Sequence, residues 1–290
     1  MKFCTFRQQG EEQVGLVSAD EQTVFALKEL DASITKMEEL IENYSSLKEK
    51  LEKQADQLTP IPIDRVELLA PIPQPKHDLL CVGLNYRLHA LESAKFAGRE
   101  YQAPKHPVYF SKRVNRAVGP NGTIQAHGDV TEKLDYEVEL AVIIGKKCSK
   151  LSPDEVFDAI FGYTVGNDVS ARDIQSAYGQ FMFGKGLDDF APLGPWIVTK
   201  DELSQPPHLN LKTYVNGELR QDSNTSDLIF DLPYMISELS QGMTLEPGDI
   251  LLTGTPAGVG MGFQPPKFLQ AGDEVICEIE GIGQLKNTIS

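Results

Sequence analysis

The sequence of 290 residues is poor in cysteine, in basic residues and in long hydrophobic runs. Its four cysteines lie far apart and form no CxxC pair, so a zinc knuckle or a redox-active pair is not expected. Scattered thiols of this kind are typical of a reducing compartment, where they stay free and mostly buried. The residues concerned are Cys4, Cys81, Cys148 and Cys277.

Long apolar segments are missing as well. An aliphatic run such as Leu140 to Ile144 has five residues, whereas a membrane-spanning helix needs about 20. The first residues, Met1 to Arg7, contain no apolar signal core. We therefore expect a cytoplasmic protein.

Positive charge is scarce, with 27 Lys and Arg against 42 Asp and Glu, a formal net charge of −15. Such a chain repels phosphate backbones and anionic lipids, so we expect no nucleic-acid partner and no membrane partner. An acidic small-molecule substrate remains open, because a bound cation can invert the local field.

The N-terminal part of the sequence has a helical pattern of apolar residues. Apolar residues recur at spacings of three and four from Ile34 to Leu51, which predicts an amphipathic helix over about 34–56. Two interpretations stay open: the helix packs on its own domain, or it forms a coiled coil with a partner. Five prolines within 59–75 then place a domain boundary near residue 75.

The second predicted domain, 76–290, consists mainly of short apolar runs broken by Gly, Pro and Asp. One helix is expected over 153–161, with Ser152 as its N-cap. This pattern indicates an α+β, β-rich fold rather than alternating βαβ units. The expected strands are 79–84, 138–144, 195–199, 211–215, 248–253 and 274–279.

Acidic residues alternate where one of these strands begins. Side chains two apart in a strand share a face, so Asp135, Glu137 and Glu139 are expected on one side of a strand that runs into the core. Their mutual repulsion near a buried strand would be relieved by a cation. The alternative is a solvated face of an edge strand.

A further carboxylate is available at Asp168, where another apolar stretch ends. Ser170 is expected to cap the helix that follows. Carboxylate oxygens alone favour Mg²⁺, Mn²⁺ or Ca²⁺ over zinc. An ordinary helix-capping cluster is the alternative for this segment.

His89 and Glu92 are candidates for acid–base chemistry. On a helix they lie three residues apart on one face, where a carboxylate can hold the imidazole as a general base requires. A surface ion pair is the alternative. Gly98 and charged residues follow, so the segment is also a candidate lid.

Two glycine-rich pieces complete the set of candidates. Lys185 lies between Gly184 and Gly186, and Thr255 opens the glycine-rich loop that ends at Gly262. Neither piece has the spacing of a phosphate-binding loop. The glycines either let backbone approach a ligand closely or form structural turns.

Together, these segments resemble the fumarylacetoacetate hydrolase family over roughly 80–287. The resemblance implies a mixed β-sandwich roll, a small variable N-terminal domain and a homodimer. The matching motifs are Val82-Gly-Leu-Asn-Tyr86 with His89 and Glu92, Asp135-Tyr-Glu-Val-Glu139, Asn167-Asp-Val-Ser-Ala-Arg-Asp173, Gly184-Lys185, Gly194-Pro-Trp196, Val215-Asn-Gly-Glu218, Pro247-Gly-Asp249, Thr253-Gly-Thr-Pro256 and Gly281-Ile-Gly283.

The resemblance also implies roles for individual residues. Glu137, Glu139 and Asp168 would bind Mg²⁺ or Mn²⁺, and Asp135 would not be a ligand. His89 and Glu92 would lie on a lid and activate water. Substrate oxygens would be contacted by Gln175, Lys185 and Thr255.

The reaction implied first is hydrolysis of a C–C bond in a small acylpyruvate-type 1,3-diketo acid. Oxaloacetate decarboxylation and isomerisation of a hydroxylated dienoate use the same metal chelation and enolate stabilisation, so they remain alternatives. A binding protein without turnover is a further alternative, but it would not need a base.

Many relatives have a tryptophan between Gln175 and Gly184. This sequence has none there, which indicates that the wall of the substrate pocket differs from that of those relatives.

Overall fold

Most strands form one large mixed sheet. The computed structural model describes residues 1–290, except for the side chain of Asp56. The strand order is β4-β3-β2-β1-β13-β11-β10-β16-β6-β7, with β5 paired to β1. The strands are β1 (Lys2–Gln8), β2 (Glu11–Val17), β3 (Thr23–Ala26), β4 (Pro60–Pro62), β5 (Glu67–Leu69), β6 (Leu79–Gly83), β7 (Val108–Lys112), β10 (Val138–Ile144), β11 (Ile160–Asn167), β13 (Leu193–Thr199) and β16 (Ile250–Leu252).

Two smaller sheets complete the strand structure. The five-stranded sheet has the order β15-β14-β17-β18-β8 and packs against β10, β11 and β13 of the large sheet, and β9 pairs with β12. The predicted α+β, β-rich class is therefore confirmed. The strands are β8 (Thr123–Ile124), β9 (Leu134–Asp135), β12 (Ser170–Ala171), β14 (Asn210–Val215), β15 (Glu218–Asn224), β17 (Glu274–Ile279) and β18 (Gly283–Ile289).

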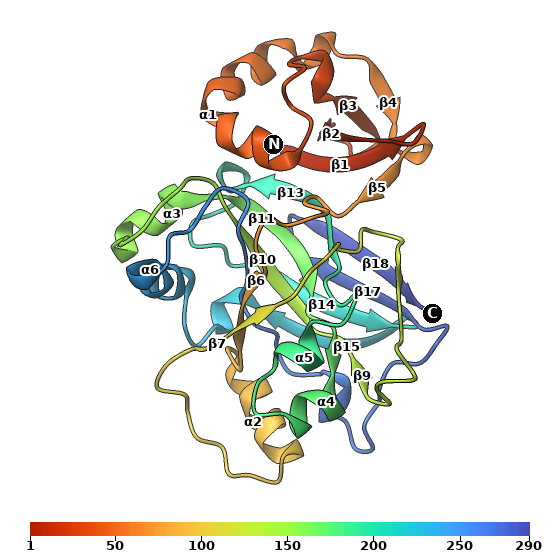
Figure 1. The fold of residues 1–290 in the computed structure, drawn as a ribbon, viewed down its shortest axis with the longest axis vertical. Coiled ribbons are helices and arrows are strands. Elements are labelled where there is room, and N and C mark those ends of the chain that lie inside the picture. The colour runs from red at the N-terminus through yellow and green to blue at the C-terminus, as the bar shows by residue number, and fades with distance from the viewer.

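The helices lie around these sheets (Figure 1). They are α1 (Met37–Gln54), α2 (Arg87–Phe96), α3 (Val156–Ala159), α4 (Arg172–Ala177), α5 (Met182–Lys185) and α6 (Leu232–Gly242). Single 3₁₀ turns are η1 (Leu27–Glu29), η2 (Ala55–Gln57), η3 (Ile63–Arg65), η4 (Pro153–Glu155), η5 (Lys200–Glu202), η6 (Thr225–Asp227) and η7 (Gly260–Gly262).

The strands β10 and β11 are buried along their whole length because both faces of the sheet are covered. The five-stranded sheet covers one face, and α1 contributes to the core on the other. There the ring of Tyr44 packs edge-on against Phe3 and Phe161, with centroids 5.8 and 5.1 Å apart. The predicted N-terminal helix thus packs within its own chain, with Leu40, Ile41 and other members of its apolar stripe buried.

The N-terminal segment continues the large sheet. Strand β1 pairs with β13 through Lys2↔Val198 and Phe3↔Ile197. Figure 1 shows α1 and β1–β4 at one end of the molecule and α2, α4 and α5 at the other. The division into 1–75 and 76–290 remains a prediction.

Three local predictions were wrong. The helix expected over 153–161 ends at Ala159, because Ile160 begins β11. Ser170 does not cap α4, because its hydroxyl donates to the carbonyl oxygen of Asp168, 2.8 Å away, and Ala171 occupies the cap position. The strand expected from residue 135 onward is interrupted between β9 and β10.

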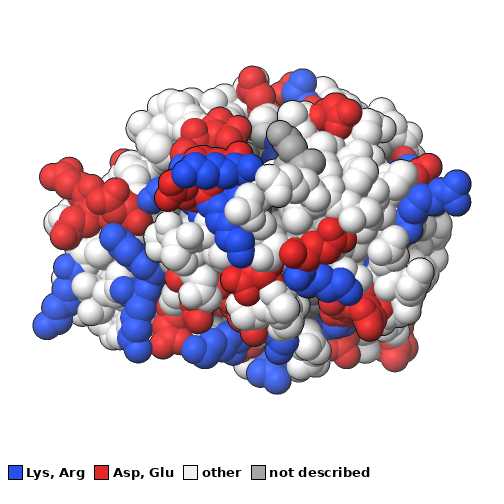
Figure 2. All heavy atoms as spheres, turned by 90° about the horizontal axis from the view of Figure 1, so that it is seen from above, with Lys and Arg blue, Asp and Glu red and all other residues white. Residues whose placement is uncertain are grey.

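The surface carries charged side chains of both signs (Figure 2), and the thiols are free, as the scattered cysteines predicted. On the face shown in Figure 2, Lys and Arg side chains lie among Asp and Glu side chains. The four cysteines are free, and three of them are buried. No helix in the described part of the chain combines the length and apolar character that crossing a bilayer requires.

Candidate active site

Three buried carboxylates meet where β10 begins and β11 ends. Glu137 directly precedes β10, Glu139 lies on it, and Asp168 follows β11. The antiparallel register pairs Val138 with Asn167, so these strand ends are neighbours. One oxygen from each carboxylate lies within 4.8 Å of the others. The structure thus brings together the three residues that the resemblance assigned to a metal.

Asp135, by contrast, is used for structure. Its carboxylate accepts hydrogen bonds from the backbone N–H groups of Gly260 and Met261 at 2.6 and 3.0 Å and from Arg172 Nε at 2.8 Å. It therefore anchors the glycine-rich loop and lies outside the three-carboxylate cluster.

Three buried cations surround the carboxylates. Lys185 Nζ lies 2.8 Å from Glu137 Oε2 and 2.6 Å from Asp168 Oδ2. Arg172 Nη2 lies 2.6 Å from Glu137 Oε1, and Lys112 forms an ion pair with Asp168 Oδ1. Sequence reasoning gave no role to Lys112 or Arg172. In the sequence, each of these two residues only appears as a basic residue at the end of a short apolar stretch. Such residues are ordinarily exposed to solvent, so neither was a candidate for the site.

The charges shift the pKa values of the carboxyl groups in opposite directions. Burial would raise the pKa of Glu137, but the positive charges of Lys185 and Arg172 outweigh burial and hold that pKa low. The pKa of Glu139 is raised well above its ordinary value, by burial first and then by the negative charges of Asp168 and Glu137. Ionised Glu139 is therefore less stabilised by its surroundings than ionised Glu137.

The pKa values of the two lysines also differ. Burial lowers the pKa of Lys112. Burial acts in the same direction on Lys185, but the negative charges of Asp168 and Glu137 outweigh it and raise the pKa of Lys185. Lys185 is therefore held as a cation beside the carboxylates.

His89 and Glu92 lie on helix α2, as predicted. His89 Nδ1 is 3.3 Å from Glu92 Oε2, and His89 is buried. Glu92 also accepts a hydrogen bond from the backbone N–H of Gly258 at 3.1 Å. A Cβ atom on Gly262 would lie 1.7 Å from Glu92 Oε1, so a side chain there would displace the Glu92 carboxylate. Helix α2 thus lies closed against the 258–262 loop.

Gln175 and Thr255 are oriented by neighbouring side chains. Arg172 Nη1 donates to Gln175 Oε1 at 3.0 Å, which directs the amide N–H groups of Gln175 elsewhere. Thr255 Oγ1 accepts from Gln221 Nε2 at 2.8 Å, so its own hydrogen is available to donate. Gln221, which sequence reasoning missed, is fully buried and also accepts from the N–H of Val138.

These residues surround one cavity of about 550 Å³. Among the candidates, Asp168 and Glu92 do not line it: Asp168 is fully buried, and Glu92 faces the 258–262 loop. Tyr178 and Phe181 contribute to the wall from the stretch where many relatives carry tryptophan. The predicted site residues that line the cavity are His89, Glu137, Glu139, Gln175, Lys185 and Thr255.

Residues 78–290 match the family described as fumarylacetoacetate (FAA) hydrolase C-terminal. Since this match covers most of the chain, the protein belongs to the fumarylacetoacetate hydrolase family, a family of enzymes. The resemblance inferred from the motifs is therefore confirmed.

Particular relatives differ in the reactions that their names state. Oxaloacetate tautomerase YisK of Bacillus subtilis is 41% identical over 304 residues, covering 100% of both chains. The mitochondrial oxaloacetate tautomerase Fahd2a of Rattus norvegicus is 45% identical over 236 residues, 81% of this chain and 73% of its own. The structure of maleylpyruvate hydrolase from Sphingobium sp. SYK-6 with manganese(II) and pyruvate is 30% identical, with a TM-score of 0.80, covering 100% of this chain and 98% of its own.

Proposed function

We propose that this protein is a metal-dependent enzyme that interconverts the enol and keto forms of oxaloacetate. The observation that carries the proposal is the similarity to the Bacillus protein named oxaloacetate tautomerase, which extends over the full length of both chains. The rat protein supports it at 45% identity. C–C hydrolysis, the reaction implied first by the motifs, becomes the second candidate, supported by the maleylpyruvate hydrolase at 30% identity.

The three-carboxylate cluster fits a divalent cation. When Asp135, Glu137, Glu139 and Asp168 are all ionised, they outnumber the buried cations Lys112, Arg172 and Lys185 by one charge. The raised pKa of Glu139 shows that its negative charge is poorly compensated. Oxygen ligands of this kind suit Mg²⁺ or Mn²⁺. Bound there, the ion would act as a Lewis acid on a 2-oxo acid.

The neighbouring donors suit the oxygens of such a substrate. The Lys185 ammonium, the Gln175 amide and the Thr255 hydroxyl line the same cavity as Glu137 and Glu139. Each can donate to a substrate carboxylate or to the oxygen on C2. That oxygen carries negative charge in the enolate through which the enol and keto forms interconvert, and fixed donors stabilise this charge without reorganisation.

Tautomerisation also requires a proton to be moved at C3. Glu92 pairs with Nδ1 of His89, which leaves Nε2 as the ring nitrogen for exchange with substrate. In the keto direction the protonated ring donates its Nε2 proton to C3, the enol hydroxyl gives its proton to water, and the ring takes up a proton from that water, so that no net proton is gained or lost. Hydrolysis would use the same nitrogen to take a proton from water, so the pair by itself serves both candidates.

The two candidates differ in their products. We expect Mg²⁺-loaded protein to accelerate the decay of the ultraviolet absorbance of enol-oxaloacetate relative to an equal concentration of the Glu139→Gln variant in the same buffer. Acetylpyruvate, followed by NMR in parallel, is expected to remain intact. Release of acetate and pyruvate, with enol decay no faster than in the variant, would instead identify a hydrolase.

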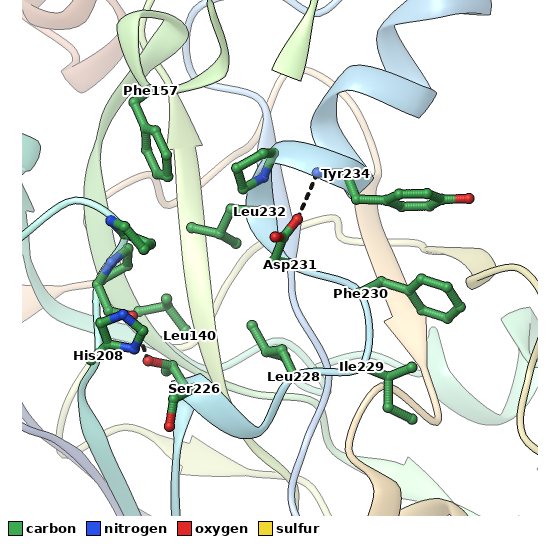
Figure 3. A pocket seen from close by; sticks show the side chains of 14 residues that line it. Leu140, Phe157, His208, Ser226, Leu228, Ile229, Phe230, Asp231, Leu232 and Tyr234 are labelled. Atoms are coloured by element: carbon green, nitrogen blue, oxygen red, sulfur yellow. Dashed lines mark hydrogen bonds between the residues drawn. The ribbon is translucent and has the colours of Figure 1, made fainter. Parts of the chain in front are cut away.

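We also propose that the protein is a homodimer, as the family resemblance implies. A second pocket of about 460 Å³, mostly apolar, lies at the start of α6 (Figure 3). At its edge the rings of Phe230 and Tyr234 lie 5.3 Å apart, and Tyr234 is 40% exposed. Covering this face with a second copy would remove apolar surface from water.

Light scattering is expected to give a mass near twice 32.1 kDa for the native chain. Tyr234→Glu, which places a charge on the apolar face, is expected to give the monomer mass. A monomeric native protein would refute the dimer, and a dimeric variant would refute this face.

A cytoplasmic location is also proposed, because all four cysteines are free and three of them are buried. Isolation of the protein from its own cells with a native disulfide would contradict it.

A further inference from the structure

Each carboxylate of the cluster has one oxygen in contact with a cationic or N–H group of its own, through a hydrogen bond at Asp168 and Glu139 and through an ion pair at Glu137. Lys112 Nζ pairs with Asp168 Oδ1, and Arg172 Nη2 lies 2.6 Å from Glu137 Oε1. The backbone N–H of Gly254 donates to Glu139 Oε2 at 2.7 Å. These three donors come from β7, α4 and the loop after β16. We call the oxygens that they hold the rear oxygens.

The remaining oxygens of Glu137 and Asp168 face a common space. Lys185 Nζ contacts both Glu137 Oε2 and Asp168 Oδ2, so these two oxygens face the same point. Glu139 Oε1 accepts no hydrogen bond from the described part of the chain. The cluster therefore offers one front oxygen from each carboxylate.

Among the rear donors, Lys112 is fully enclosed by the protein. Its side chain is 0% exposed, and its ammonium also donates to the carbonyl oxygen of Val169 at 2.8 Å. The ring of Phe190 lies 5.9 Å from Nζ. Because the Lys112 ammonium is buried and bonded to two acceptors, it holds Asp168 Oδ1 in place, and Asp168 cannot easily turn both oxygens toward the front.

This arrangement matters for the choice of metal. Ca²⁺ prefers about six to eight oxygen ligands and commonly takes both oxygens of a carboxylate, whereas Mg²⁺ is octahedral and keeps several waters. We propose that the rear donors, with Lys112 foremost, restrict each carboxylate to one ligand oxygen and so select Mg²⁺ or Mn²⁺ against Ca²⁺. The inference rests on the metal site of the proposed function but is independent of the reaction.

The test is isothermal titration of the native protein and two variants with Mg²⁺, Mn²⁺ and Ca²⁺. The native protein is expected to bind Mg²⁺ and Mn²⁺ more tightly than Ca²⁺. Lys112→Met, which keeps the length and removes the rear donor, is expected to raise the ratio of Ca²⁺ to Mg²⁺ affinity by about tenfold, because Asp168 can then bind through both oxygens. Lys185→Met is the matched control: it removes a cation from the front oxygens, so affinity for both ions rises and their ratio stays unchanged.

The titrations test the metal site, its ion selectivity and the role of Lys112 separately. Absence of any metal binding by the native protein would refute the metal site itself. Tighter binding of Ca²⁺ than of Mg²⁺ by the native protein would overturn the selectivity, and this result needs no variant to fold. An unchanged ratio in a folded Lys112→Met protein, or an equal change in Lys185→Met, would overturn the role of Lys112.

Discussion

Glu139→Gln is expected to lose metal binding while keeping the stability of the fold. The pKa of Glu139 is raised by burial and by the neighbouring carboxylates, so folding favours its neutral form. Glutamine resembles that neutral form, and its side-chain oxygen can still accept the N–H of Gly254. Affinity for Mn²⁺, measured by titration calorimetry, should fall by more than about a hundredfold, because a direct ligand contributes more than the outer-shell groups that cost 10–100-fold.

Asp168→Asn provides the contrast. Asp168 pairs with both Lys112 and Lys185, so its neutralisation leaves two buried cations without this partner. Removal of one partner from a buried pair costs roughly 3–5 kcal/mol. We therefore expect Asp168→Asn to lower both the metal affinity and the unfolding temperature, whereas Glu139→Gln lowers only the first. Equal losses of stability in the two variants would contradict the charge distribution described here.

His89→Gln is expected to lower kcat for enol-oxaloacetate by about a hundred- to ten-thousand-fold, the usual contribution of a positioned acid or base. His89 is not among the clustered carboxylates, so affinity for Mn²⁺ should not change. The measurement is the initial rate of enol decay at saturating Mn²⁺, with calorimetry on the same protein. Wild-type kcat in this variant would show that another group moves the proton.

Much of the site could be predicted because it depends on short-range order. The two-residue spacing of Glu137 and Glu139 and the i, i+3 spacing of His89 and Glu92 are local properties. Glu137 directly precedes β10 and Glu139 lies on it, while His89 and Glu92 both lie on α2. Asp168 was identified by its place at the end of an apolar run, which became β11.

The residues that sequence reasoning missed depend on tertiary placement. Lys112 reaches Asp168 from β7, at the far end of the sheet order, and nothing near Lys112 in the sequence indicates that contact. Arg172 stood within a quoted motif, but its bridge between Asp135 and Glu137 becomes visible only in the folded chain. Ser170 has a hydroxyl that could cap the N-terminus of the following helix, but the pairing of β12 with β9 places Ser170 in a strand.

The central claim is that a metal held by Glu137, Glu139 and Asp168 supports proton transfer at C3 of oxaloacetate without breaking a C–C bond. The most direct measurement is an NMR time course of oxaloacetate in heavy water with Mg²⁺-loaded protein. The account predicts that deuterium enters C3 faster than in the Glu139→Gln control, while pyruvate forms at the same rate in both samples. Accelerated formation of pyruvate, or C3 exchange no faster than in the control, would contradict it.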